Sequence, residues 1–301
     1  MISVQGLVKH YGDVRAVDGV DLSVAAGEVF ALLGPNGAGK TTIVEILEGH
    51  RNRTSGTVTV LGEDPETAGR EFRERIGIVL QSNAIEKELT VREAIDTYGS
   101  FYPKRRETGE LMEIVGISGK ADARIKTLSG GQQRRLELAL GIVGDPELIF
   151  LDEPTTGFDP SARRKAWQVI DNLRQLGRTI LLTTHYMDEA QNLADRVAVI
   201  AGGVIVAEGT PDTLGGRADA ASIVRFRLVN VDAGELPIDP TTLSVEPGGS
   251  IQISTVDATR VLHSLATWAI ERDIELIGLT VDRPTLEDVY LDLAGERGGD
   301  D

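Results

Sequence analysis

The sequence contains no cysteine, only four histidines and fewer basic than acidic residues, and each shortage excludes a class of protein. Without cysteine the chain can form neither a disulfide nor a thiolate metal site, and the histidines are too scattered to form a metal-ligand cluster. No apolar run approaches the ~18 residues that a membrane-spanning helix needs. The amino terminus lacks a basic segment followed by an apolar core, so we expect no secretory signal and a location on the cytosolic side of the membrane.

The formal net charge of −16 argues against a nucleic-acid partner, because neutralising phosphates requires a basic face. It also disfavours direct docking on anionic lipid. Solubility alone is the simplest explanation of this acidity. The charge is unevenly distributed, since residues 216–301 contain 16 acidic and 7 basic residues, the latter all arginine. This shift in composition predicts a domain boundary near Gly215 and Gly216.

The length of 301 residues is consistent with two domains. Apolar strand-like segments alternate with helical segments up to about residue 200, which is typical of a parallel sheet covered by helices. Residues 82–145 are mostly helical in pattern and predict a separate lobe, in which Thr90 and Glu93 form a capping box for a helix that extends to about Tyr102. Residues 216–301 predict a small α+β domain that ends with a helix over 285–293.

A glycine-rich segment after the apolar strand 29–33 matches the phosphate-loop pattern G-x-x-x-x-G-K-[ST]. The glycines allow backbone N–H groups to face phosphates, and the helix that follows adds its N-terminal dipole. Lys40 is expected to reach the β- and γ-phosphates, and Thr41 to ligate Mg²⁺. The alternative is a simple glycine-rich turn. The loop residues expected to contact a nucleotide are Gly34, Pro35, Asn36, Gly37, Ala38, Gly39, Lys40, Thr41 and Thr42.

Two acidic residues follow a second apolar strand, 148–151. A carboxylate at the position of Asp152 is the usual second anchor of Mg²⁺ in enzymes with a phosphate loop. Glu153 comes next, followed by Pro154, so a strand-ending turn is the alternative interpretation of this segment.

The segment LSGGQ provides a second candidate anion site, because Ser129, Gly130 and Gly131 precede a helix that begins near Gln132. A phosphate already held by Lys40 does not obviously need such a site in the same chain. The alternative is a serine-capped helix start with two flexible glycines.

Taken in order, these motifs resemble the ATP-binding subunit of an ABC transporter over about residues 1–215. The resemblance implies an α/β fold of the P-loop NTPase class, with a parallel-sheet core, an antiparallel β subdomain and a helical lobe, followed by an accessory domain at 216–301. It also implies that ATP and Mg²⁺ bind and that two subunits pair head to tail as a homodimer, each LSGGQ closing over its partner's ATP. The segments that carry the resemblance are GPNGAGKTT at 34–42, IGIVLQ ending at residue 81, LSGGQ at 128–132, LIFLDEP at 148–154 and TILLTTH ending at residue 185.

The same resemblance implies roles for individual residues. Glu153 would be the general base that polarises the attacking water, and His185 would contact the γ-phosphate. Gln81 would contact Mg²⁺ or the attacking water and carry the signal into the helical lobe. Tyr11 would stack on adenine, and Asp159 would lie in the loop that meets the partner subunit.

The segment LTVDRPTLEDVYLDLAG at 279–295 resembles the carboxy-terminal end of exporter ATPases of the daunorubicin-resistance type. This resemblance implies an ABC-2 exporter for a drug, natural product or lipid-like substrate, held at the cytoplasmic face of the membrane by separate multi-span permease subunits. A helix face packed on its own small sheet is the alternative for the end of this segment. Phe158 departs from the family, in which leucine is more frequent at this position.

Two other functions stay open at this point. A soluble ABC ATPase could act on ribosomes or DNA without a membrane partner, although the acidic charge disfavours it. A regulatory cassette could bind ATP without hydrolysing it, although Lys40, Asp152, Glu153 and His185 are all present.

Overall fold

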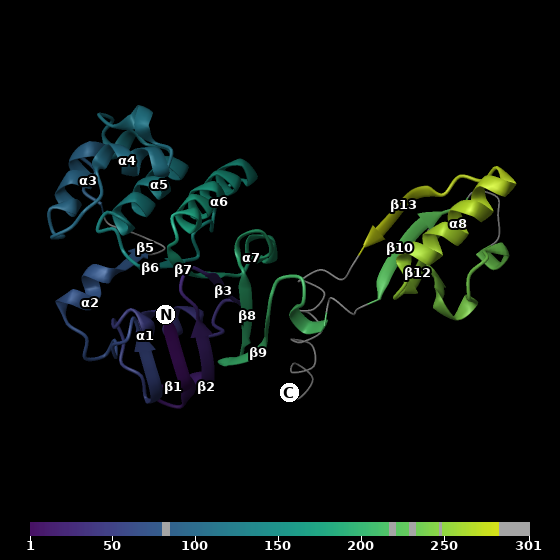
Figure 1. The fold of residues 1–301 in the computed structure, drawn as a ribbon, viewed down its shortest axis with the longest axis horizontal. Coiled ribbons are helices and arrows are strands. Elements are labelled where there is room, and N and C mark those ends of the chain that lie inside the picture. The colour runs from purple at the N-terminus through teal and green to yellow at the C-terminus, as the bar shows by residue number, and fades with distance from the viewer. Residues whose placement is uncertain (80–84, 217–220, 229–232, 247–248, 283–301) are drawn as a thin grey trace. The chain divides into compact units, whose positions relative to one another are not determined.

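The computed structural model describes residues 1–79, 85–216, 221–228, 233–246 and 249–282 (Figure 1). The chain divides into a larger unit, Met1–Pro211, and a smaller unit, Asp212–Asp301. Within the described ranges, no helix is both long and apolar enough to cross a membrane.

A mixed sheet forms the centre of the larger unit, with its described strands in the order β5-β6-β7-β3-β8-β9. Neighbouring strands are parallel except for β9, which runs antiparallel to β8. Every residue of β3 is buried, which explains why this strand is apolar throughout instead of alternating. The parallel-sheet core expected from the sequence is confirmed. The strands are β3 (Val29–Leu33), β5 (Ile76–Val79), β6 (Leu148–Asp152), β7 (Thr179–Thr184), β8 (Arg196–Ala201) and β9 (Val204–Gly209).

An antiparallel sheet in the order β2-β1-β4 packs against the same hydrophobic core. Its strands are β1 (Ile2–Tyr11), β2 (Val14–Val24) and β4 (Ser55–Val60). The register pairs Ile2 with Val60 and Val4 with Val58, and all four side chains are buried. One face of this sheet therefore contributes to the core, because alternate side chains of a strand point to the same face.

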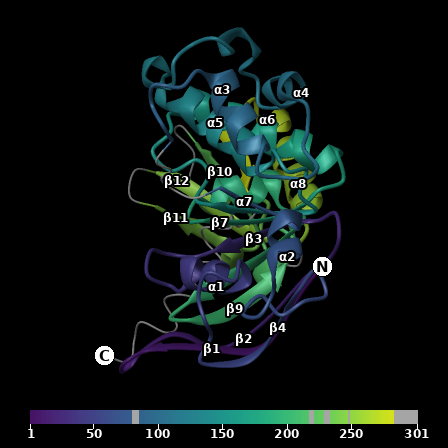
Figure 2. The same ribbon diagram turned by 90° about the vertical axis from the view of Figure 1, so that its left-hand side faces the viewer.

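The helices fall into two groups. Figures 1 and 2 both show α3 (Val91–Gly99), α4 (Thr108–Ile114) and α5 (Gly130–Gly141) gathered in a lobe away from β1 and β2. The remaining described helices of the larger unit are α1 (Lys40–Leu47), α2 (Arg70–Arg75), α6 (Pro160–Gln175) and α7 (Met187–Leu193), with short 3₁₀ turns at Ser118–Lys120 and Ile125–Thr127. The 3₁₀ turn Leu214–Gly216 belongs to the smaller unit.

The predicted capping box at the start of α3 is confirmed, because the Thr90 side chain accepts a hydrogen bond from the Glu93 N–H and the Glu93 side chain accepts one from the Thr90 N–H. The predicted end of this helix near Tyr102 is wrong, since α3 ends at Gly99. At this end the Asp96 carbonyl oxygen accepts hydrogen bonds from the Ser100 N–H at 3.0 Å and from the Arg105 side chain at 3.2 Å, so a basic side chain adds to the backbone bond of the last turn.

Helix α5 approaches strand β5 closely because glycines lie on both sides of the contact. A Cβ atom on Gly77 would lie 2.2 Å from the carbonyl oxygen of Gly141. A Cβ atom on Gly141 would lie 2.5 Å from Cγ2 of Val79. Space, and not an unusual backbone conformation, is what requires glycine at these two positions.

The smaller unit contains an antiparallel sheet in the order β11-β12-β10-β13 and the helix α8 (Ala258–Arg272). Its core includes Val224 and Phe226 from β10, Ile253 from β12, and Leu265 and Trp268 from α8. The strands are β10 (Ser222–Arg227), β11 (Leu243–Val245), β12 (Ser250–Thr255) and β13 (Ile277–Asp282), with 3₁₀ turns at Ala233–Glu235 and Pro240–Thr242. The helix expected over 285–293 lies outside the described residues.

Candidate active site

The phosphate loop connects β3 to α1, as the sequence predicts. A Cβ atom on Gly34 would lie 2.4 Å from the carbonyl oxygen of Ile200 on β8, so only glycine fits where the strand ends. Gly39 has a φ of 105°, a conformation that side chains rarely adopt, and it lies immediately before the helix. The loop is therefore shaped by residues that permit close backbone approach, as an anion-binding loop requires.

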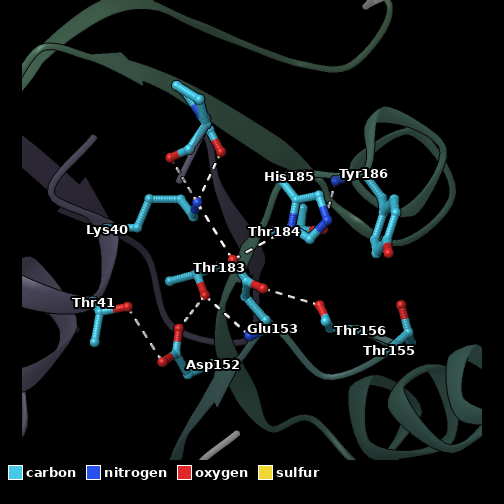
Figure 3. A network of polar contacts seen from close by, with 12 residues as sticks. Lys40, Thr41, Asp152, Glu153, Thr155, Thr156, Thr183, Thr184, His185 and Tyr186 are labelled. Carbon is cyan, nitrogen blue, oxygen red and sulfur yellow. Dashed lines mark hydrogen bonds and ion pairs between the residues drawn. The ribbon is translucent and has the colours of Figure 1, made fainter. Parts of the chain in front are cut away.

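Lys40 is the first residue of α1, and its side chain is almost completely buried at 4 % exposure. Its Nζ donates hydrogen bonds to the carbonyl oxygens of Gly34 at 2.8 Å and Pro35 at 3.0 Å, and it lies 3.5 Å from Oε1 of Glu153 (Figure 3). Burial lowers the pKa of the Lys40 ammonium, although the negative charges of Glu153 and Asp152 act to raise it. The ammonium is thus fixed at the loop by contacts with its backbone.

Asp152 ends β6 beside Thr41 of α1. Its Oδ2 accepts a hydrogen bond from Oγ1 of Thr41 at 3.4 Å, and its other carboxylate oxygen accepts one from Thr183 of β7 (Figure 3). A hydroxyl and a carboxylate oxygen are the ligands that Mg²⁺ prefers, and this ion usually completes its shell with water and substrate phosphates. The two side chains from different elements therefore fit a magnesium ion.

Glu153 lies just beyond β6 in a left-handed conformation, with a φ of 46°. Its N–H donates to the Thr183 hydroxyl at 3.1 Å, and its Oε2 accepts a hydrogen bond from the Thr156 hydroxyl at 2.9 Å. Burial acts to raise the pKa of the Glu153 carboxyl, but the Thr156 hydrogen bond and the charges of Lys40 and His185 outweigh it, so the pKa is lowered. The carboxyl group is therefore ionised, and hydrogen bonds hold both the backbone and the side chain of Glu153 in place.

His185 follows the last residue of β7 and points toward Glu153 (Figure 3). Its Nδ1 lies 3.3 Å from Oε1 of Glu153, the same oxygen that contacts Lys40. Its ring also contacts the ring of Tyr186, with centroids 4.1 Å apart. The structure thus brings together three of the four predicted catalytic residues, and the fourth, Gln81, lies outside the described residues.

A cavity of about 300 Å³ opens where the phosphate loop and the end of β6 meet. The phosphate loop and the β6 carboxylates thus contribute to one cavity, whose polar lining can take a phosphate chain with its metal ion. The lining consists of Ala16, Asn36, Gly37, Gly39, Lys40, Thr41, Thr42, Asp152 and Glu153.

The LSGGQ segment faces a different cavity. Ser129 caps α5 in a capping box with Gln132, whose Oε1 accepts a hydrogen bond from the Ser129 N–H at 3.0 Å. Ser129 and Gly130 line a cavity of about 580 Å³ together with Glu153 and Asp159. The two predicted anion sites are therefore separate within one chain, and Glu153 borders both.

Asp159 caps the amino terminus of α6, since its Oδ1 accepts hydrogen bonds from the N–H groups of Ser161 at 2.8 Å and Ala162 at 3.0 Å. These bonds lower the pKa of the Asp159 carboxyl. The carboxylate fixes the end of the loop that begins at Glu153, in addition to any contact with a partner.

Tyr11 is 41 % exposed at the end of β1, and the described lining of the 300 Å³ cavity does not include it. Two cations flank its ring, with Nζ of Lys9 at 5.1 Å and Cζ of Arg51 at 5.3 Å from the ring centroid. Its ring is therefore held in place on the surface, where an aromatic platform is accessible.

Two buried charged residues near the site, Arg134 and Glu189, were not among the residues predicted from the sequence. Arg134 on α5 donates to the carbonyl oxygens of Pro154 at 3.1 Å and Asp152 at 3.3 Å, so the helix that follows LSGGQ is tied to the end of β6. Both residues could have been identified as charged positions on the otherwise apolar side of their helices, but such a pattern does not show what the charge contacts.

Comparison with known proteins agrees with this geometry. Residues 17–156 match the family model described as ABC transporter, and residues 222–285 match the model described as ABC transporter domain-containing protein-like, C-terminal domain. The chain is 38 % identical to Nod factor export ATP-binding protein I of Bradyrhizobium diazoefficiens over 304 residues, which cover 98 % of this chain and 96 % of that protein. It is 36 % identical to daunorubicin resistance ATP-binding protein DrrA3 of Streptomyces coeruleorubidus, with the same two coverages.

Solved structures show the same fold. The chain superposes on a nucleotide-free ATP-binding cassette from an ABC transporter with a TM-score of 0.62 and 26 % identity, covering 70 % of this chain and 91 % of that one. A dimeric ATP-binding cassette bound to ADP and phosphate has a TM-score of 0.62 at 24 % identity, covering 70 % of this chain and 98 % of that one, and supports the fold alone.

Proposed function

Since the chain belongs to the family of ABC transporter ATP-binding proteins, whose cassettes bind and hydrolyse ATP, we propose that its hydrolysis of MgATP drives export through separate membrane subunits. The observation that carries the proposal is the polar network in which Lys40, Glu153 and His185 share one carboxylate oxygen beside the phosphate loop. The network lies at the carboxyl ends of parallel strands, where ligands bind in open α/β sheets.

In this proposal each residue of the network has a role that its position allows. Lys40 exchanges part of its contact with Glu153 for the β- and γ-phosphates. Thr41 and Asp152 hold Mg²⁺, which when bound neutralises charge on the transferred phosphoryl group. Glu153 accepts a hydrogen bond from the attacking water and orients it, and His185 contacts the γ-phosphate. Tyr11 stacks on the adenine. Gln81 is proposed to complete the metal or water contacts.

We propose a head-to-tail homodimer because one chain does not bring its two anion sites together. Ser129, Gly130 and Gly131 line a cavity separate from the one that Lys40 lines, and Gln132 follows them in the first turn of α5. A second copy would place its LSGGQ segment on the nucleotide of the first, and Asp159 would lie in the contact region. ATP is then shared between two subunits, so binding favours the dimer and hydrolysis releases it.

The proposed division of labour assigns residues 1–215 to the ATP-binding domain and residues 216–301 to an accessory domain that supports dimer pairing or regulation. The compact units, which meet at Pro211 and Asp212, support a boundary in this region. The match of residues 222–285 to a C-terminal domain of ABC proteins supports a separate accessory role.

Both relatives are named for export or drug resistance, which supports a drug, natural product or lipid-like molecule as the exported substrate. The permease subunits would bind that substrate and would hold this chain at the cytoplasmic face of the membrane. No nucleic-acid partner is proposed, in agreement with the net charge of −16.

The substitution Glu153→Gln tests the catalytic assignment. The variant keeps the size of the side chain but cannot act as a base, so we expect it to bind MgATP, to hydrolyse it about 10²–10⁴-fold more slowly, and to accumulate as a dimer in size-exclusion chromatography. Glu113→Gln on the exposed side of α4 is the matched control and should behave as wild type. A Glu153→Gln variant that hydrolyses ATP at the wild-type rate would contradict the assignment.

The transport assignment needs a separate test. Tagged Glu153→Gln protein, incubated with MgATP and detergent-solubilised membranes of the host, should recover a multi-span membrane protein identified by mass spectrometry. Recovery of ribosomal proteins or DNA-associated proteins without a membrane partner would refute the export role and leave the ATPase assignment intact.

A further inference from the structure

Glu189 is a fully buried acidic residue that the catalytic assignment does not use. It lies in the first turn of α7, and its exposure is 0 %. Burying a carboxyl group costs free energy unless hydrogen bonds replace those it made to water. Its contacts should therefore indicate why a charged residue occupies this position.

One oxygen of Glu189 accepts hydrogen bonds from two elements that are distant in the sequence. Oε1 accepts from the hydroxyl of Thr155 at 2.8 Å and from Nε1 of Trp167 at 3.2 Å. Thr155 is two residues beyond Glu153 in the chain, and its hydroxyl is itself completely buried with the rest of its side chain. Trp167 lies on α6, the helix that Asp159 caps.

The helix that carries Glu189 begins two residues after His185. A second contact joins the same two helices, because Arg163 of α6 pairs with Asp188 at 3.0 Å and lies over the ring of Tyr186 at 4.2 Å from its centroid. Helix α7, helix α6 and the loop between Glu153 and Asp159 are thus joined at one buried acceptor and an adjacent ion pair.

We propose that Glu189 is a positioning residue for ATP hydrolysis, which fixes His185 against Glu153 and links both to the loop that ends at Asp159. The inference rests on the proposed function, because it takes Glu153 and His185 as the groups that act on water and the γ-phosphate. If Asp159 contacts the partner subunit, the same link allows binding of that subunit to change the positions of both catalytic side chains.

Apart from His185, the groups proposed to hold the nucleotide and its metal ion lie on the phosphate loop, on α1 and at the end of β6, and Glu189 bonds to none of them. Lys40 and Thr41 lie on α1, and the contacts of Lys40 are with the phosphate loop and Glu153. Loss of the Glu189 acceptor should therefore reduce kcat and leave KM for ATP nearly unchanged. A misplacement of about 1 Å between reacting groups can slow a reaction by about 10²-fold.

The chain offers two pairs of matched variants for the test. Glu189→Met has similar length but no acceptor, whereas Glu189→Gln keeps an Oε1 that can accept from both Thr155 and Trp167. Thr155→Val removes the donor at nearly constant volume, whereas Thr155→Ser keeps a hydroxyl. Each variant is compared with wild type for kcat, for KM and for the melting temperature of the full-length protein.

We expect Glu189→Met and Thr155→Val to lower kcat by about 10- to 100-fold with KM within about threefold of wild type, and the Gln and Ser variants to retain kcat within about threefold. The proposal is overturned if the Gln and Met variants lose activity equally, if KM and not kcat changes, or if the Met and Val variants are fully active. If Glu189→Met does not fold, the Thr155 pair decides alone. Failure of the proposed function would give a different result, namely that the Glu153→Gln variant hydrolyses ATP at the same rate as wild type.

Discussion

Glu48 provides the clearest test of the energetics of this fold, since it is a carboxyl group buried without adequate compensation. It follows the last residue of α1 and is 3 % exposed. Within the described residues neither of its carboxyl oxygens has a hydrogen-bond partner, and Nδ1 of His50 lies 3.3 Å from Oε2. Burial, followed by the negative charges of Asp152 and Glu45, raises the pKa of Glu48 from 4.5 to about 8.

The raised pKa sets the sign and size of a pH effect. Between these two pKa values the folded protein keeps a proton on Glu48 that the unfolded chain has lost, so stability falls as the pH rises. The contribution is complete below pH 4.5 and is lost progressively until the pH passes about 8. With a slope of about 1.4 kcal/mol per pH unit, the wild type should lose about 2.5 kcal/mol between pH 5 and pH 7 through this group.

The substitution Glu48→Gln removes this titration and keeps the shape of the side chain. The free energy of unfolding of the variant, relative to wild type, should therefore increase by about 2.5 kcal/mol from pH 5 to pH 7, or about 5–10 °C in melting temperature for a unit of this size. A Trp268→Phe background leaves Trp167 as the tryptophan, so fluorescence reports on the larger unit alone. The control Glu113→Gln, on an exposed position, should change by less than about 0.5 kcal/mol at either pH.

Groups that titrate equally in wild type and in Glu48→Gln do not affect the result, because only the difference in free energy of unfolding between the two proteins is compared at pH 5 and pH 7. If the difference between Glu48→Gln and wild type is the same at pH 5 and pH 7, the carboxyl group is not held protonated by the fold. If the difference has the opposite sign, Glu48 is stabilised as an anion and the reasoning from burial is wrong.

Three further predictions follow from the site and its lobe. Lys40→Met should weaken ATP binding about 10- to 100-fold, because a buried charged hydrogen bond contributes about 1.5–3 kcal/mol; wild-type affinity in a fluorescent-nucleotide titration would exclude Lys40 as a phosphate ligand. EDTA should abolish hydrolysis, and Thr41→Val should raise the Mg²⁺ concentration needed to restore it; an unchanged requirement would remove Thr41 from the metal site. Thr90→Val should destabilise the larger unit by about 1 kcal/mol in urea unfolding through loss of the α3 cap, whereas Thr90→Ser should not.

Strong local signals in the sequence predicted most of the larger unit. The apolar run of β3 and the glycines after it specify the strand, the loop and the position of Lys40, because each of these constraints acts between near neighbours. Strand β9 and helix α2 were not predicted. In α2 only Phe72 is buried, and in β9 most side chains are half-buried, so neither segment has an apolar period that could identify it.

The contacts around the catalytic groups were harder to predict than the groups themselves. Glu153 was identified from the resemblance to ABC ATP-binding subunits. Its left-handed backbone and its hydrogen bond to Thr156 depend instead on how β7 and the loop after β6 pack. Arg134 and Glu189 were missed for the same reason. Pro154, a partner of Arg134, lies 20 residues away in the chain, and Thr155, a partner of Glu189, lies 34 residues away. A local sequence pattern cannot predict contacts at such separations.

The glycine contact between α5 and β5 has an evolutionary consequence. Gly77 and Gly141 lie at the same close contact between α5 and β5, so a side chain at either position must displace the helix from the strand. A substitution at either glycine alone therefore destabilises the packing of the two elements. The helix in question begins at LSGGQ, and the strand lies next to the one that ends at Asp152. Selection on ATP turnover should therefore act on two glycines that never touch a nucleotide, and among descendants of this chain the two positions should stay small together or diverge together.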